Sequence, residues 1–275
     1  MIDLLTITNL PEQAARCDQM PGMRLFVDLE RNGKAARQKG HDTFISTHHL
    51  SDVGNIKAVL KQSSLMVRVN PYQMDNSAAS KAEIDAVLNQ GADMLMLPMF
   101  RSAKELSAFA GFVAGRAPIV ALLETASALH SLHSWIDTPG IYEIFVGLND
   151  LHLSLGCSFM FEPLAAGHVG RVANAAKVRG LRFGFGGIAR MDEGALPGRD
   201  VLAEHVRLGS GAVILSRTFN RADAQPAEKS FEQAVAELRT AELALSLRSP
   251  EYVENDRLHS NGLIAELVKA AKVPA

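Results

Sequence analysis

The chain contains few cysteines and few large aromatic residues, and it has no excess of positive charge. Its 275 residues include two cysteines, Cys17 and Cys157, with one tryptophan and three tyrosines. Two cysteines cannot supply the disulfide framework of a small secreted domain, so we expect a reducing compartment. The net charge is −2, with no basic block or stripe, which argues against a nucleic-acid partner.

Long apolar runs are also missing. A membrane-spanning helix needs about 20 apolar residues in succession, and no run in this sequence approaches that length. Pro11, Glu12 and Arg16 stand where a signal peptide would need an apolar segment. We therefore expect a cytoplasmic protein with no membrane partner. Apolar residues still make up 47% of the chain, which is enough for a large core.

What the chain does contain is a series of short apolar runs separated by segments with helical spacing. Residues 51–62, for example, place Val53, Ile56 and Val59 on one helix face. Alternation of strands and helices predicts a parallel sheet, and eight units in about 200 residues predict an α/β fold of the (β/α)8 TIM barrel type. The expected strands are residues 24–30, 42–47, 65–70, 92–98, 118–125, 143–150, 181–188 and 211–219.

The predicted barrel domain covers residues 1–225, and residues 1–22 form a short lead-in with one helix over 11–20. Residues 226–275 follow as a C-terminal helical arm. It holds an amphipathic helix over 230–247, a break at Ser249-Pro250 and a second helix near 262–272. Since a barrel needs one helix after its last strand, we expect the arm to pack on the barrel or on a neighbouring subunit of a homo-oligomer.

Two of the expected strands end in a single carboxylate. Glu124 ends the run over 118–125, and Asp150 ends the run over 143–150. In a barrel the carboxyl ends of the strands share one rim, where active sites lie. Two carboxylates without a histidine or cysteine ligand suit a hard cation, so we predict a Mg²⁺ or Mn²⁺ site at Glu124 and Asp150.

A divalent cation at this rim suggests a 2-oxo acid as substrate, because its carboxylate and keto oxygens can chelate the ion. Arg68 ends the third expected strand and could donate to the keto oxygen as it becomes an enolate. The alternative is that Arg68 only forms a structural ion pair with one of the carboxylates. Pro98, Gly147 and Asn149, at the ends of other runs, are predicted to contact the substrate.

His48 and His49 follow the second expected strand. Either could serve as a general acid or base, since histidine titrates near neutral pH. The alternative is that at least one of them caps the following helix or faces solvent. Asp28 and Glu30 could reach the rim or pair with Arg31. Gly184, Gly186, Gly187 and Gly211 could hold a phosphate or could only give room for substrate.

Four segments, LMVRVNP (65–71), GADMLMLPMF (91–100), ALLETASAL (121–129) and FVGLNDLHLSLG (145–156), resemble the motifs of the HpcH/HpaI aldolase and citrate lyase β-subunit family. The resemblance covers most of residues 24–220. It implies a (β/α)8 barrel, a divalent metal on Glu124 and Asp150, and substrate binding by Arg68. It also implies the making or breaking of a C–C bond through a pyruvate- or acetyl-type enolate.

The chain departs from the family pattern after the second expected strand. The aldolase branch has a Glu-His pair there, where this chain reads Thr47-His48-His49. The citrate lyase branch has a Leu-Glu-Asp pattern there, and Leu29-Glu30 resembles a fragment of it that follows the first expected strand. The hypothesis is therefore a metal-dependent carbon–carbon lyase or aldolase acting on a 2-oxo acid. The alternatives are a CoA-thioester lyase and a barrel that binds a small acid without turnover.

Overall fold

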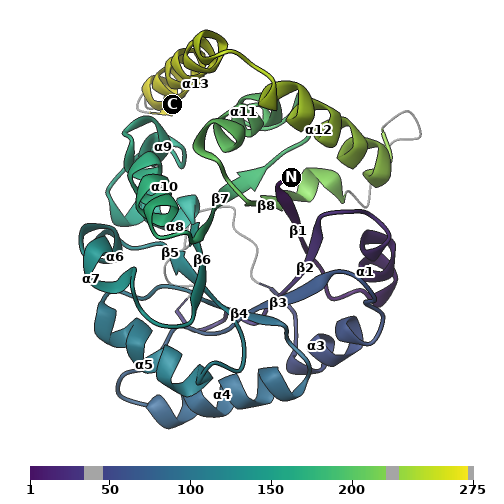
Figure 1. The fold of residues 1–275 in the computed structure, drawn as a ribbon, viewed down its shortest axis with the longest axis vertical. Coiled ribbons are helices and arrows are strands. Elements are labelled where there is room, and N and C mark those ends of the chain that lie inside the picture. The colour runs from purple at the N-terminus through teal and green to yellow at the C-terminus, as the bar shows by residue number, and fades with distance from the viewer. Residues whose placement is uncertain (34–45, 221–228, 272–275) are drawn as a thin grey trace.

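The computed structural model describes residues 1–33, 46–220 and 229–271, and these form a closed barrel of eight parallel strands in chain order. Helices surround the barrel (Figure 1), as the alternating pattern predicts. The strands are β1 (Asp3–Ile7), β2 (Met23–Asp28), β3 (Ser64–Arg68), β4 (Met94–Leu97), β5 (Ile119–Leu123), β6 (Ile141–Val146), β7 (Arg182–Ile188) and β8 (Ala212–Leu215).

Short helices and turns lie between the strands, and two longer helices follow β8. Segment 162–179 forms two helices rather than the single one expected, because Gly167 adopts a left-handed φ of +79° between them. The described helices are α1 (Pro11–Asp18), α3 (Leu50–Lys57), α4 (Ser77–Asn89), α5 (Ala103–Val113), α6 (Ala126–His130), α7 (Leu132–Trp135), α8 (Leu148–Ser154), α9 (Glu162–Ala165), α10 (His168–Val178), α11 (Gly198–Leu208), the 3-10 turn η1 (Arg217–Phe219), α12 (Phe231–Ser246) and α13 (Pro250–Ala271).

The expected number of strands is correct, but the assignment of the first two was wrong. β1 lies inside the segment predicted as a lead-in, and it pairs with both β2 and β8. No further strand lies between β2 and β3 in the described barrel, because the two pair directly through Arg24 and Ser64. Ser46 and Thr47 are not in a strand, and residues 42–45 lie outside the described part of the chain. The run over 24–30 is therefore the second strand.

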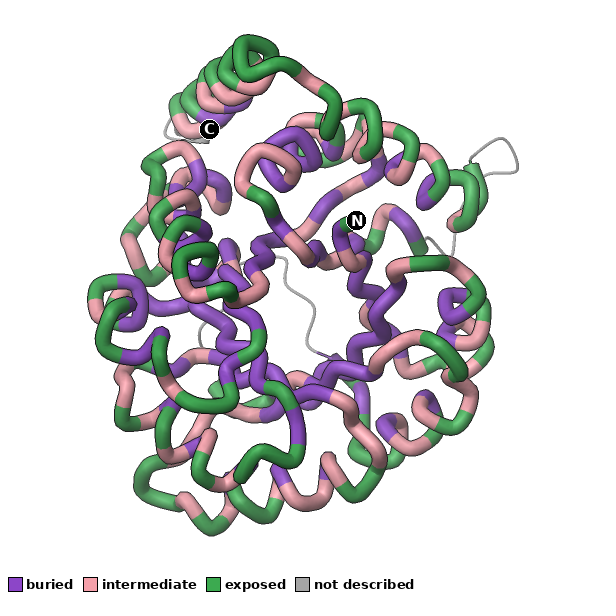
Figure 2. The backbone as a smooth tube through the Cα atoms, in the orientation of Figure 1, coloured by how far each residue is buried: buried purple, intermediate pink, exposed green. Residues whose placement is uncertain are grey.

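Alternation along each strand divides the core into two parts. One set of side chains points into the barrel and the other packs against the helices. The barrel interior contains Leu5, Phe26, Met66, Val120 and Phe145, which form a cluster separate from the larger core between strands and helices. The strands are buried along almost their whole length (Figure 2). The same alternation sends the last inward position of each strand to the carboxyl rim.

The amino end of the barrel is closed by ion pairs instead of apolar side chains. Arg24 on β2 crosses to Glu143 on β6 with N–O distances of 2.9 and 3.0 Å, and also donates to Asp3 at 2.6 Å. Arg182 on β7 joins the same two carboxylates. Arg24 and Glu143 are at most 2% exposed, so both partners are needed to offset the cost of desolvation. The barrel is therefore filled at this end, and its open pocket lies at the other.

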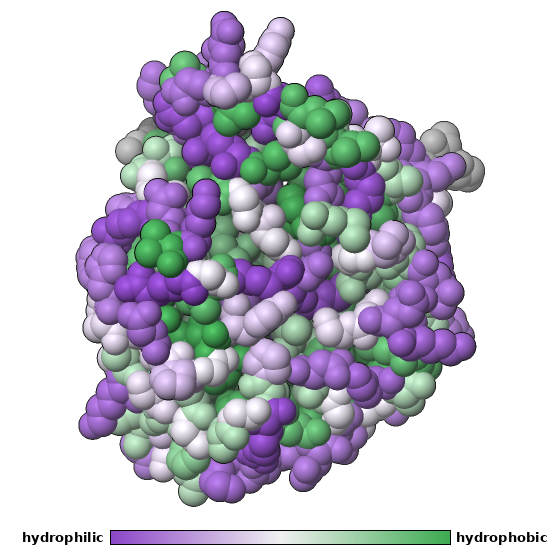
Figure 3. All heavy atoms as spheres, in the orientation of Figure 1, coloured by the Kyte–Doolittle hydropathy of each residue, from purple (hydrophilic) through white to green (hydrophobic). Residues whose placement is uncertain are grey.

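The C-terminal helices α12 and α13 pack beside α11 and α9 (Figure 1). Arg239 on α12 donates to the backbone carbonyl of Ile2, and Glu242 accepts the Ile2 N–H, which ties this helix to β1. Apolar side chains also appear at the surface near these helices (Figure 3), and the exposed ones on them are Leu243, Leu247, Tyr252 and Leu258. The arm thus contacts its own barrel, and its contact with a second subunit stays a prediction.

Within the described ranges, no helix is both long and apolar enough to cross a membrane.

Candidate active site

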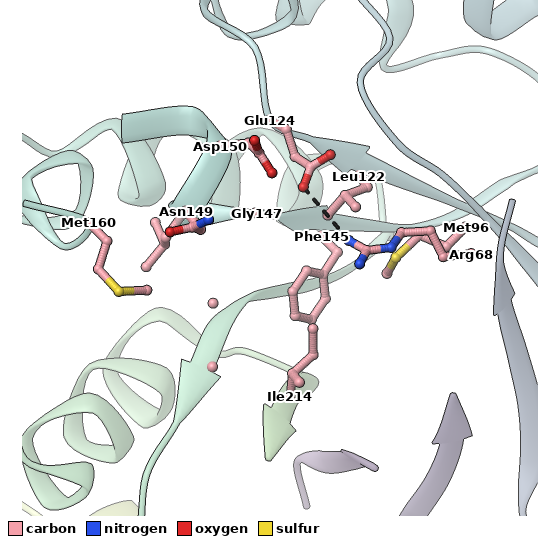
Figure 4. A pocket seen from close by; sticks show the side chains of 13 residues that line it. Arg68, Met96, Leu122, Glu124, Phe145, Gly147, Asn149, Asp150, Met160 and Ile214 are labelled. Atoms are coloured by element: carbon pink, nitrogen blue, oxygen red, sulfur yellow. Dashed lines mark ion pairs between the residues drawn. The ribbon is translucent and has the colours of Figure 1, made fainter. Parts of the chain in front are cut away.

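A pocket of about 230 Å³ opens among the carboxyl ends of β3 to β8 (Figure 4). It contains four of the residues that the sequence predicted to act together: Arg68, Glu124, Asn149 and Asp150. Gly147, also predicted, lies in its wall. The other lining residues are Met96, Leu122, Phe145, Leu148, Met160, Gly186, Gly187 and Ile214.

The two carboxylates come from neighbouring elements. Glu124 follows β5 at the next inward position after Leu122, and Asp150 lies in the first turn of α8, directly after β6. A carboxylate is favourable in the first turn of a helix because the backbone N–H groups there are unpaired. Glu124 is 3% exposed and Asp150 is 8% exposed. Both oxygen-bearing groups therefore lie in the pocket although both are largely out of bulk water.

Gly147 allows Glu124 to take its position. The Gly147 N–H donates to the carbonyl of Leu123 at 3.0 Å. This hydrogen bond places the segments that follow β5 and β6 side by side at the rim. A Cβ atom at Gly147 would lie 2.6 Å from both Cγ and Oε1 of Glu124, closer than real contacts allow. The glycine is therefore required by the close approach of the Glu124 side chain.

Arg68 is held by Asp28. The two residues are register partners on β3 and β2, and both point into the barrel. Arg68 donates from Nε and Nη2 to the two Asp28 oxygens at 2.9 and 2.8 Å, and its Nε lies 3.5 Å from Glu30. Its Nη1 lies 4.0 Å from Oε1 of Glu124, the pair marked in Figure 4. The structural ion pair considered from the sequence is thus present, but with Asp28, and Nη1 remains directed toward the pocket side.

Burial alone would lower the pKa of Arg68, but the Asp28 carboxylate outweighs this and holds that pKa above its usual value. The guanidinium is therefore permanently charged. Three buried carboxylates lie within 4.0 Å of it, from Asp28, Glu30 and Glu124.

The donor set fits a divalent ion that keeps open positions. Glu124 and Asp150 face the same pocket, and the described residues contain no group of three His, Cys, Asp or Glu side chains around one point. Magnesium commonly takes one or two protein carboxylates and completes its octahedron with water and substrate oxygens. The two carboxylates therefore suit Mg²⁺ or Mn²⁺ better than a site closed by protein ligands.

Pro98 does not line this pocket, in contrast to the prediction. It is buried after β4, and the next residue, Met99, adopts a left-handed φ of +57°. Met99 directs its N–H toward Oε2 of Glu124 at 3.3 Å. The contact that this turn makes with Glu124 is thus a backbone donor, which no side-chain pattern in the sequence could identify.

His48 and His49 lie outside this pocket. Together with Arg31, Asn70 and Glu83 they line a separate hollow of about 260 Å³ beside α3 and α4. Residues 46–49 are not in a strand, so neither histidine ends one. Their assignment as acid or base stays a prediction.

The two rings have different surroundings. Nδ1 of the buried His48 accepts the N–H of Asp28 at 3.1 Å, so a neutral ring carries its proton on Nε2. In this arrangement the lone pair of Nδ1 is used by the backbone of Asp28. His49 is exposed and precedes α3 as its N-cap, as the alternative reading expected for one of the pair. Its N–H donates to Asp52 at 2.7 Å.

The apolar wall of the pocket was missed in the sequence. Met96, Leu122, Phe145 and Ile214 occupy inward positions near the ends of their strands, so the alternation within each run was the available signal. Met160 comes from the segment between α8 and α9, where no periodicity indicates its direction. Its place in the pocket depends on tertiary structure.

The model of the HpcH/HpaI aldolase/citrate lyase family matches residues 15–183, which is more than half of the chain. The chain belongs to this family. Membership supports a role as a lyase or aldolase, as the resemblance of the four motifs implied. No curated protein matches the sequence.

Solved structures share the fold at low sequence identity. An HpcH/HpaI aldolase from Desulfitobacterium hafniense DCB-2 is 16% identical with a TM-score of 0.57, covering 78% of this chain and 86% of that chain. An HpcH/HpaI aldolase/citrate lyase family protein from Burkholderia cenocepacia J2315 is 16% identical with a TM-score of 0.61, covering 90% and 95%. A citrate lyase from Burkholderia xenovorans LB400 is 14% identical with a TM-score of 0.61, covering 99% and 82%. At such identities the similarity establishes the barrel alone.

The strand assignment changes how the chain compares with the two branches of the family. Leu29-Glu30 was placed after the first strand by sequence reasoning, but β2 ends at Asp28, so the dipeptide follows the second strand. This is the place where the citrate lyase branch has Leu-Glu-Asp. The third residue differs, since Arg31 stands there and donates to the His48 carbonyl at 2.7 Å. One alternative drawn from the sequence paired Asp28 with Arg31. In the structure Asp28 instead accepts hydrogen bonds from Arg68.

Proposed function

We propose that this protein is a divalent-metal-dependent carbon–carbon lyase or aldolase that acts on a 2-oxo acid through a pyruvate-type enolate. The observation that supports it is the convergence of Arg68, Glu124 and Asp150 on one pocket at the carboxyl end of the barrel. A guanidinium beside two carboxylates suits a substrate with adjacent carboxylate and keto groups.

Glu124 and Asp150 would hold the cation, Mg²⁺ or Mn²⁺. When bound, such an ion acts as a Lewis acid toward the keto oxygen of the substrate. Arg68 would donate from Nη1 to an oxygen of the substrate, while Asp28 keeps the other edge of the guanidinium fixed. Asn149 and the backbone at Gly147 border the same space and would orient the substrate.

The proposed cleavage uses a 4-hydroxy-2-oxo acid. The C3–C4 bond breaks, and its electron pair passes to C3 and the keto group to give the enolate. The hydroxyl on C4 loses its proton to water and becomes the carbonyl of the aldehyde. C3 then takes up a proton, which releases the 2-oxo acid. The reaction is redox-neutral, and it is reversible as an aldol addition.

The test uses oxaloacetate, whose loss of CO₂ leaves the same enolate without an aldehyde. We expect the wild type to decarboxylate oxaloacetate with Mg²⁺ or Mn²⁺, to stop with a chelator and to recover when the metal returns. Glu124→Gln and Asp150→Asn keep the size of the side chain and remove its charge. Each variant should fold and lose activity. Its affinity for the metal, measured by calorimetry, should be much lower than that of the wild type. Absence of metal binding by the wild type, even with pyruvate or oxalate present, would favour the binding-only barrel.

A second candidate is a CoA-thioester lyase of the citrate lyase type. The observation in its favour is the position of Leu29-Glu30 after β2, with Glu30 buried and 3.5 Å from Arg68. The two candidates differ in the substrate that is cleaved. Comparing hydroxy acids with their CoA thioesters in one assay separates them, since the second candidate requires turnover of the thioester alone.

A further inference from the structure

The pocket has a polar end, named here for Arg68, Glu124 and Asp150, and a second end at Met160 (Figure 4). Arg68 lies at one end, with Glu124 and Asp150 along one side (Figure 4). Met160 lies at the opposite end of the view, beyond Asn149. Apolar side chains of Leu148, Phe145 and Ile214 also line the pocket. A substrate whose oxygens contact the polar end can therefore extend its remaining atoms toward Met160.

Met160 is held in place by its neighbours. Oε1 of Glu162 accepts the N–H groups of Ser158 and Phe159 at 2.5 and 2.7 Å, which fixes the turn before α9. The rings of Phe159 and Phe161 pack with centroids 5.6 Å apart, and Phe161 is buried. The residue between these two rings is thus presented to the pocket by an anchored segment. Its own side chain is unbranched and can adapt to what lies beside it.

We propose that Met160 determines which aldehyde this site accepts, and that this aldehyde carries a small, uncharged alkyl group. The inference rests on the proposed function. The alkyl group would lie against Leu148, Met160 and Ile214 while the 2-oxo acid occupies the polar end. An anionic substituent in the same place would lose hydration without gaining a cationic partner from these three side chains. Each misfitting methylene in such a pocket changes selectivity by roughly 10- to 200-fold.

The experiment measures the aldol addition of pyruvate to a panel of aldehydes with Mg²⁺, reported as kcat/KM. The panel contains propanal, butanal and hexanal, and the anionic glyoxylate and succinic semialdehyde. We expect the wild type to favour propanal or butanal over both anionic aldehydes by at least about 10-fold, the lower limit for a misfitting group. Met160→Ala should shift the preference toward hexanal. Met160→Lys should raise the relative rate with succinic semialdehyde.

Met191→Ala is the matched control, because Met191 is also half-buried but does not line the pocket. Its aldehyde preference should equal that of the wild type. Oxaloacetate decarboxylation, measured on every variant, needs no aldehyde and reports the polar end alone. Its rate in each Met160 variant is therefore compared separately from the aldehyde preference.

The outcomes separate the inference from the function on which it rests. Without decarboxylation by the wild type, the proposed function fails and the inference fails with it. If decarboxylation occurs but the wild type prefers anionic aldehydes, the inference is overturned and the proposed function stands. The same holds if Met160→Ala and Met160→Lys leave the aldehyde preference unchanged.

Discussion

At the scale of single residues, the geometry of Arg68 depends on how its donors are shared. Asp28 takes Nε and Nη2, and Nη1 is the nitrogen that approaches Glu124. A planar guanidinium can serve both sides at once because its donors diverge in fixed directions. The residue is thus both a structural ion-pair partner and a proposed oxyanion donor, and the two alternatives drawn from the sequence do not exclude each other.

Arg68→Lys should keep the fold and lower the rate of oxaloacetate decarboxylation by about 10²–10³, the usual cost of one oxyanion donor. A lysine carries all its N–H donors on one nitrogen. That nitrogen cannot lie beside Asp28 and on the substrate side of the pocket at the same time. Circular dichroism and steady-state kinetics measure the two effects. Arg101→Lys, at an exposed arginine after β4, is the control and should be unchanged. Near wild-type turnover by the Arg68 variant would show that Arg68 is only structural.

Gly147→Ala should weaken metal binding without unfolding the protein. The new methyl group would lie 2.6 Å from Glu124, so the carboxylate has to move away from Asp150's side of the pocket. Disturbing the residues that orient a metal ligand commonly lowers the metal affinity by about 10- to 100-fold. Titration of Mn²⁺ by calorimetry measures the change. Gly111→Ala is the control, since that glycine lies in α5 with open space around its Cβ position. Equal affinity in the wild type and the Gly147 variant contradicts the prediction.

At the scale of elements, α11 is packed onto β7 through a buried histidine. The ring of His205 stacks on Phe185 with centroids 3.8 Å apart, and its Nδ1 lies 2.8 Å from Oγ of Ser210. That hydroxyl already donates to the Ala212 carbonyl, so Nδ1 carries the proton and donates. Among the described residues, Nε2 has no partner. The neutral ring therefore acts as a packing group between helix and strand.

Burial lowers the pKa of His205 to about 3, compared with 6.5 for an ordinary histidine. Below pH 6.5 the unfolded chain binds a proton at this site and the folded chain does not. The stability that depends on neutral His205 is thus complete above pH 6.5 and is lost as the pH falls toward 3. We expect a loss of about 1.4 kcal/mol per pH unit in this window, measured by urea denaturation at several pH values.

His205→Phe keeps the stacked ring and removes the titration, so its stability should fall less steeply between pH 6.5 and 5. His133→Gln, at an exposed histidine, is the matched control and should follow the wild type. Identical slopes for the His205 variant and the wild type would assign the acid sensitivity to other groups.

At the scale of the whole molecule, the C-terminal arm presents apolar side chains that its own barrel does not cover. Leu247 is 78% exposed at the end of α12, and Tyr252 is 66% exposed at the start of α13. Exposed apolar groups gathered on one surface are typical of protein–protein contacts. We therefore expect the arm to bury this surface against another copy of the chain, which is the homo-oligomer predicted from the sequence.

Leu247→Glu combined with Tyr252→Glu should lower the mass of the particle measured by light scattering, with the helical content unchanged. Each new glutamate carboxylate would lose its hydration inside the subunit contact without gaining a cationic partner. Val178→Glu is the control, because Val178 is 83% exposed at the end of α10 and lies outside the arm. A monomeric wild type, or an oligomer that both sets of variants leave intact, counts against the prediction.

The sequence by itself determined the barrel, because eight buried parallel strands require apolar runs at regular spacing. It also indicated Glu124 and Asp150, since each comes shortly after such a run, but Asp150 lies in the first turn of α8 and does not end a strand as expected. Arg68 was identified for the same reason. β1 was missed because Asp3 and Thr6 interrupt its short apolar run, and its partners β2 and β8 lie at distant places in the sequence.

Only the tertiary structure decided which groups share the pocket. Register across β2 and β3 pairs Asp28 with Arg68, and the close approach of two loops explains Gly147. The left-handed turn at Met99 supplies a backbone donor, and an anchored loop supplies Met160. His48 and His49 lie in a different hollow, lined also by Asn70 and Glu83. These features depend on distances between separate elements, and a single sequence carries spacing along the chain but no distances across it.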